Sequence, residues 1–107
     1  MSVFLTDGAA RDLDEWYVAL HATGGQAAAR SALERISDLF SRLARGDLTG
    51  DVPRELRHLG LRATRQVLGS DGLRVVYEVA KDDIYVISLA PDGQSFQSLL
   101  SRRLLDA

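Results

Sequence analysis

The sequence predicts a single α+β domain, spanning residues 1–107, in which a two-helix hairpin packs on a four-stranded, mainly antiparallel sheet. Three observations support this fold class. The first half of the chain carries two stretches whose apolar residues recur at helical spacing, separated by a glycine pair. The second half carries three β-prone runs separated by turn sequences. A short apolar run opens the chain and an amphipathic stretch closes it, so the expected order is β-α-α-β-β-β followed by a short C-terminal helix.

The first strand is expected at residues 3–5, which are apolar and β-prone. Thr6 or Asp7 can cap the helix that follows, because a short side-chain oxygen accepts a hydrogen bond from a free N–H of the first turn. Apolar residues then fall at positions i, i+3, i+4 and i+7, and these are Leu13, Trp16, Tyr17 and Leu20. This stripe predicts one helical face that packs on the rest of the domain.

The second helix is expected over residues 26–45, after Gly24 and Gly25 end the first. Its apolar stripe consists of Ala29, Leu33, Ile36, Phe40 and Leu43. Because only a few residues around the glycine pair connect the two helices, they should form an antiparallel hairpin.

The remaining strands are expected at residues 62–68, 73–80 and 84–89. Turn sequences at residues 69–72 and 81–83 separate them, which predicts an antiparallel meander that the first strand joins. Both faces of these strands carry apolar residues, so we expect the helices to cover one face and the other to be used in part. The C-terminal helix is predicted from the spacing of Phe96, Leu99, Leu100 and Leu104.

The composition excludes several classes of protein. Hydrophobic residues make up 46% of the chain and charged residues 26%, which argues against disorder. The chain has no cysteine, so disulfides, thiolate zinc sites and cysteine nucleophiles are excluded. No apolar run approaches the roughly 20 residues that a membrane helix needs, and no signal-peptide pattern is present. We therefore expect a cytoplasmic protein without a cofactor.

Positive charge gathers in the second half, where residues 54–74 contain five arginines against two acidic residues. The candidate cluster consists of Arg62, Arg65, Arg74 and Tyr77, with Arg54, Arg57 and His58 close in sequence. Guanidinium groups pair well with phosphate oxygens, so this cluster could bind phosphates. The alternative is that the arginines form a solvated face and Tyr77 belongs to the core. Neither His21 nor His58 has a partner at metal-ligand spacing.

Several segments, in this order and spacing, resemble the RelE/ParE toxin superfamily, and the ParE branch in particular. They are residues 10–17, 60–67, 73–79, 85–87 and 97–105. The resemblance implies the toxin of a type II toxin–antitoxin system. Such a toxin would inhibit DNA gyrase by binding it, without being an enzyme, and a cognate ParD-like antitoxin would neutralise it in a hetero-oligomer. Contact with DNA would then come only through the antitoxin, and no membrane is involved.

The resemblance also suggests which residues bind each partner. Target binding is expected at Arg62, Arg65, Arg74, Tyr77, Arg102 and Arg103. Antitoxin binding is expected at Trp16, Tyr17, Leu20, Phe40, Leu99 and Leu100. For Trp16 and Phe40, burial in the core is the alternative interpretation.

Two other functions stay open, a RelE-like ribosome-dependent mRNA endonuclease and an inactive module that only binds an antitoxin. The chain has Thr64 and Leu73 where related sequences commonly carry aromatic residues, and residues 93–95 lack the usual Arg-Arg-Asp. No tyrosine or histidine follows Tyr85. RNA cleavage requires a general base, a general acid and charge stabilisation, so these departures favour a toxin that is not an enzyme.

Overall fold

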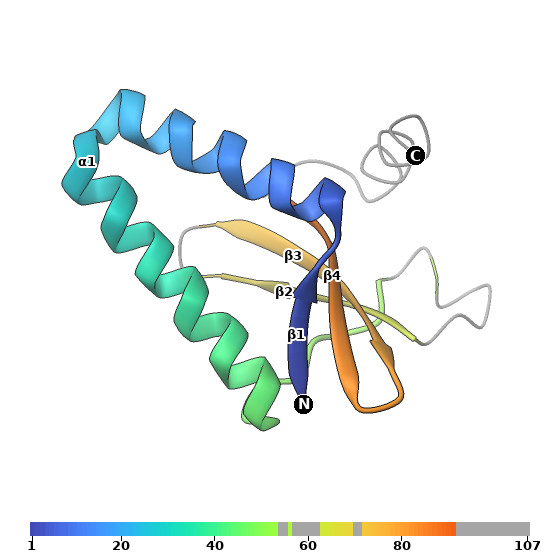
Figure 1. Cartoon of the computed structure of the whole chain (residues 1–107). Helices are drawn as coiled ribbons and strands as arrows, with labels where there is room; N and C mark the ends of the chain where they lie inside the picture. Colours follow the sequence, from blue (N-terminus) through green and yellow to red (C-terminus); the bar gives the residue numbers. More distant parts are fainter. Residues whose placement is uncertain (54–55, 57–62, 70–71, 92–107) are drawn as a thin grey trace.

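The computed structural model describes residues 1–53, 56, 63–69 and 72–91 (Figure 1). The elements are β1 (Ser2–Leu5), α1 (Asp7–Arg45), β2 (Thr64–Leu68), β3 (Leu73–Ala80) and β4 (Asp83–Pro91). These elements confirm the α+β class, and α1 packs on one side of the sheet. The expected C-terminal helix lies outside the described residues, as do Arg62, Leu99, Leu100, Arg102 and Arg103.

The prediction of two helices joined by a connecting loop is wrong, because α1 is one continuous element with a sharp bend. The bend is at Gly25, whose φ of 84° and ψ of 177° are not helical. Glycine adopts this positive φ without a steric penalty, so a single residue turns the chain and no loop is needed. Figure 1 shows the two parts of α1 diverging from the bend. We call residues 7–24 the N-terminal arm and residues 26–45 the C-terminal arm.

The start of α1 is as the sequence predicts. Thr6 is the N-cap, and its hydroxyl oxygen accepts a hydrogen bond from the backbone N–H of Ala9 at 3.2 Å. The apolar stripe of the C-terminal arm differs from the prediction at two positions. Leu33 is 37% exposed, whereas Leu39, which the predicted stripe omitted, is buried in the core.

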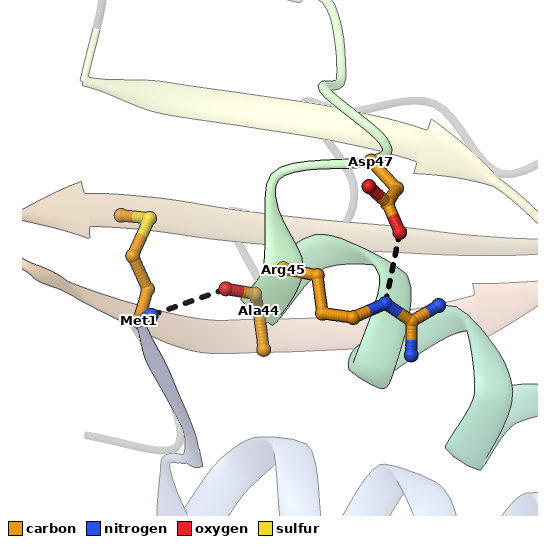
Figure 2. Close-up of polar contacts among 4 residues, drawn as sticks. All are labelled: Met1, Ala44, Arg45 and Asp47. Atoms are coloured by element: carbon orange, nitrogen blue, oxygen red, sulfur yellow. Dashed lines mark hydrogen bonds and ion pairs between the residues drawn. The ribbon is translucent and has the colours of Figure 1, made fainter.

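The end of α1 is surrounded by charged groups, one from the start of the chain and two from residues at or just after the end of the helix (Figure 2). Gly46 ends the helix with a left-handed φ of 77°. The amino group of Met1 donates to the carbonyl oxygen of Ala44 at 3.1 Å, where the negative end of the helix dipole favours a cation. Nε of Arg45 donates to the carboxylate of Asp47 at 2.8 Å. This hydrogen bond and the charge of Asp47 raise the pKa of Arg45 above its ordinary value.

The sheet has the strand order β1-β4-β3-β2. Strands β2, β3 and β4 form the predicted antiparallel meander, and β1 joins it by pairing in parallel with β4. The register between β3 and β4 shifts by one residue after Val76. Val76 pairs with Ser88, but the next residue, Tyr77, pairs with Val86, so Ile87 is left out of the pairing. Residues three apart in a strand normally point to opposite sides, but this bulge lets Val86 and Leu89 both enter the core under α1.

The main core lies between α1 and the side of the sheet that we call the helix-facing side. Its buried members are Ala9, Ile36, Leu39, Leu43, Leu73, Val75, Tyr77, Ile84, Val86 and Leu89. The opposite side of the sheet, which we call the outer face, carries a smaller buried cluster of Val52, Leu56, Val76 and Ala90. Both sides of the sheet therefore take part in apolar packing, as predicted.

One buried carboxylate ties the N-terminal arm to the sheet. Asp12 is a buried residue of α1, and its Oδ2 accepts a hydrogen bond from the backbone N–H of Leu89 at 3.1 Å. The hydroxyl of Ser88 donates to the same oxygen at 3.4 Å. Because both donors lie beside the bulge, Asp12 fixes the position of α1 over the irregular part of β4.

Candidate partner-binding cleft

The predicted basic cluster is divided between the two sides of the sheet. Arg65 is the cross-strand partner of Tyr77, whereas Arg74 is the partner of Leu68. Paired side chains share a side, and successive side chains alternate, so Arg65 lies with Tyr77 on the helix-facing side and Arg74 lies on the outer face. The structure therefore does not bring Arg65 and Arg74 together.

Tyr77 is a core residue, as the alternative interpretation of the cluster stated. It is 2% exposed, and its hydroxyl oxygen accepts a hydrogen bond from the backbone N–H of Gly50 at 2.7 Å. A Cβ atom at Gly50 would lie 2.3 Å from the carbonyl oxygen of Gln66, so only glycine fits this approach. The hydroxyl of Tyr77 thus holds the segment after α1 against β2.

A cleft of about 400 Å³ lies between the C-terminal arm of α1 and β2. Its apolar lining combines residues from both arms of α1, the segment after α1, β2 and β3, namely Trp16, Ile36, Leu39, Leu48, Val67, Leu68 and Leu73. Trp16, which the sequence suggested for antitoxin binding, therefore reaches this cleft while also packing against the core. Such a lining suits the apolar side chains of a bound peptide.

The cleft also has polar residues, all from the C-terminal arm. They are Ser31, Glu34, Arg35, Asp38 and Arg42. Nη1 of Arg35 donates to the hydroxyl of Ser31 at 2.7 Å. Acidic and basic groups are balanced here, so the lining favours a peptide with mixed charges around an apolar anchor rather than a nucleic acid.

Strand β2 offers a sheet edge beside the cleft. Asp51 and Gln66 pair through two backbone hydrogen bonds of 3.0 and 2.8 Å. The backbone groups of Gln66 point away from β3, and Asp51 occupies both of them. Outward-facing residues alternate along an edge, so Leu68 is the next one. Within the described residues, no backbone group pairs with Leu68 on this edge, and its side chain is 55% exposed. A peptide in the cleft can therefore add a strand at Leu68.

Tyr17, Leu20 and Phe40, which were also suggested for antitoxin binding, do not line the cleft. Tyr17 and Leu20 are partly buried on the N-terminal arm, and the ring of Tyr17 lies 6.4 Å from that of His21. Phe40 packs against the core, as its alternative interpretation stated. Sequence reasoning missed Leu48, Val67 and Leu68, because nothing local indicates that β2 is an edge strand.

Two kinds of site are missing from the part of the chain that the structure describes. No three histidine or acidic side chains in it are grouped closely enough to hold a metal ion. None of its helices combines the length and apolar character needed to cross a bilayer.

The family model described as the ParE toxin of the type II toxin–antitoxin system parDE matches residues 3–96. The chain belongs to this family. Among solved structures, it is similar to the chromosomal ParDE toxin–antitoxin system of P. aeruginosa, with a TM-score of 0.69 and 19% identity over 86% of this chain and 96% of that one. It is also similar to the isolated RelE toxin of E. coli, with a TM-score of 0.54 and 17% identity over 97% of both chains. No curated protein sequence matches the chain.

These comparisons confirm the resemblance to the RelE/ParE superfamily and to its ParE branch. The chain is thus a ParE-type toxin by family, and its overall fold is similar to that of both solved structures.

Proposed function

We propose that this ParE family member inhibits DNA gyrase by binding it, and that a ParD-like antitoxin neutralises it by occupying the cleft between α1 and β2. The family match over residues 3–96 carries this proposal. The similar ParDE structure is that of a toxin–antitoxin system, which supports an antitoxin as partner.

The arrangement of the described residues supports action by binding rather than by catalysis. Cleavage of RNA needs acid, base and charge-stabilising groups that converge on one phosphate. Here Arg65 and Arg74 lie on opposite sides of the sheet, and the hydroxyl of Tyr77 is buried against Gly50. These three residues cannot meet around a single phosphate, which argues against the endonuclease alternative.

The target is tested with purified gyrase and the purified, unmodified protein. We expect inhibition of supercoiling and accumulation of the cleavage complex, both reversed by an equimolar amount of the antitoxin. Absence of either effect at high toxin excess rejects gyrase as the target. Cleavage of ribosome-bound mRNA by the same preparation would instead support the RelE-like alternative.

The antitoxin site is tested with two matched substitutions of exposed apolar residues. Leu68→Asp places a charge on the exposed β2 edge beside the cleft, on the same side of the sheet as Arg74, whereas Val18→Asp places the same charge on the N-terminal arm away from this edge. We expect Leu68→Asp to weaken antitoxin binding by about tenfold or more, because a peptide strand added at this edge would place an apolar side chain against the new carboxylate. Equal affinities of the two variants would reject the cleft as the antitoxin site.

The inactive-module alternative is tested by expressing the chain without a partner. We expect growth arrest that co-expression of the antitoxin relieves. Normal growth at a verified level of folded protein would favour a module that only binds the antitoxin.

A further inference from the structure

The outer face of the sheet is divided into two halves. In one half, Val52 and Leu56 cover Val76 and Ala90. The other half carries one row of side chains across all four strands. Pairing of strands places Phe4 beside Tyr85, Tyr85 beside Glu78, and Glu78 beside Thr64. We call these four residues the outer row.

Two exposed aromatic rings form one end of the outer row. The rings of Phe4 and Tyr85 are stacked, with centroids 5.5 Å apart and planes inclined by 24°. Phe4 is 47% exposed and Tyr85 is 38% exposed, so the stack is open to solvent at a part of the sheet where β1 forms the edge. Burying such a pair against a partner gains apolar contact at little cost in side-chain entropy, since the stack already orders both rings.

A carboxylate lies directly beside the rings. Glu78 is exposed and is the cross-strand neighbour of Tyr85. Within the part of the chain that the structure describes, its carboxylate has no hydrogen-bond or ion-pair partner. Asp83 lies on the same face in the adjacent row, between Ser2 and Ala80. The described residues of this half therefore offer negative charge and aromatic surface together.

This combination selects for one kind of side chain. An arginine guanidinium stacks on an aromatic ring and at the same time donates two hydrogen bonds to a neighbouring carboxylate. A lysine ammonium lacks the planar group that makes both contacts at once. A phosphate group would be repelled by Glu78 and Asp83, so a nucleic acid backbone is disfavoured at the outer row.

We infer that the outer row binds an arginine side chain presented by the protein target of the toxin, with the guanidinium on Tyr85 and Phe4 and its N–H groups donating to Glu78. This inference rests on the proposed function and specifies the surface that contacts gyrase. The cleft opens on the helix-facing side, where Leu73 and Val67 line it, whereas the outer row is on the opposite side. For that reason the outer row is assigned to the target and not to the antitoxin.

The test compares two variants with the same change of charge. Glu78→Arg reverses the charge of the outer row, and Glu15→Arg does so at an exposed position of α1. Both proteins are assayed for inhibition of purified gyrase, for affinity to the antitoxin and for thermal unfolding. We expect Glu78→Arg to raise the concentration needed for half-inhibition of gyrase by about tenfold or more, with Glu15→Arg unchanged. Antitoxin affinity should stay within about twofold for both variants.

A second pair of variants tests the aromatic contribution without changing charge. Tyr85→Ala should weaken inhibition more than Tyr85→Phe, because phenylalanine keeps the ring on which a guanidinium stacks. Wild-type inhibition by Glu78→Arg and Tyr85→Ala overturns the inference. An equal loss in Glu15→Arg, or a parallel loss of antitoxin affinity, also overturns it. If the unmodified protein fails to inhibit gyrase, the proposed function itself fails and the target assignment falls with it.

Discussion

The two sides of the sheet serve different purposes in this molecule. The helix-facing side is closed by α1, and residues such as Val75, Tyr77 and Val86 are almost completely buried there. Among the described residues, Val52 and Leu56 pack over one half of the outer face, and the other half carries the exposed stacked rings of Phe4 and Tyr85. Exposed aromatic surface of this kind is typical of a surface that contacts a partner.

The largest effect should come from the helix-facing side. Tyr77→Ala removes a large buried side chain and should lower the free energy of unfolding by about 3–5 kcal/mol. Tyr77→Phe keeps the ring but leaves the N–H of Gly50 without its acceptor, so a smaller loss of about 1–3 kcal/mol is expected. Urea denaturation measures both losses. Complete loss of toxicity in folded Tyr77→Phe would show that the hydroxyl also acts outside the core.

A second substitution tests the attachment of α1 to β4. Asp12→Ala leaves the N–H of Leu89 and the hydroxyl of Ser88 without this acceptor. The unpaired backbone N–H alone should lower the free energy of unfolding by about 1–3 kcal/mol. Asp12→Asn keeps one acceptor oxygen and should be milder. Amide hydrogen exchange should show faster exchange at Leu89 in the alanine variant. Unchanged protection there would contradict a role for Asp12 at the bulge.

The third comparison lies within the outer face. Val76→Ala in the covered half should lower the free energy of unfolding by about 1–3 kcal/mol, because the valine is buried under Val52 and Leu56. Tyr85→Ala in the open half should cost less than about 1.5 kcal/mol, mainly through the lost stack on Phe4. Thermal or chemical unfolding gives both values. A larger loss at Tyr85 would mean that the open half contributes to stability and is not kept for a partner.

The smallest effect is expected at the end of α1. Because the pKa of Arg45 is raised, its pairing with Asp47 contributes wherever both groups are charged, and this contribution is lost as the pH rises through the raised pKa of Arg45. Arg45→Ala should therefore leave the unfolding midpoint unchanged between pH 5 and 8, within about the error of the measurement, because the pair is exposed. A pH-dependent shift in that range would indicate a different partner for Asp47.

Local chemistry explains which parts of the fold were predictable. The β-branched run of β3 lies between two turn sequences, and its predicted bounds of residues 73–80 are those of the structure. The glycine pair in α1 marked a change of direction correctly, but a sequence does not distinguish a loop from one glycine with positive φ. Leu33 was predicted to be buried and is exposed, whereas Leu39 is buried without having been predicted. An apolar stripe does not show how the bent helix lies on the sheet.

The candidate site was less predictable because it depends on pairing between distant strands. Arg65 and Arg74 are close in sequence terms, yet the register of β2 and β3 separates them onto opposite sides. The cleft needs α1 and β2 side by side, and the outer row needs β1 beside β4. None of these contacts has a local signature. The bulge after Val76 likewise has no motif in the sequence that marks it.

The bend at Gly25 has a consequence for how this fold can vary among its relatives. Each residue added to an unbroken helix rotates everything after it by about 100°, which would turn an apolar face away from the sheet. Since the backbone of Gly25 is not helical, the rotation of the C-terminal arm about its axis is not fixed by the number of residues in the N-terminal arm. Insertions and deletions of a few residues at the tip can therefore accumulate during evolution while Ile36 and Leu39 keep facing the sheet, so the length of the arms can diverge between homologues that share one cleft.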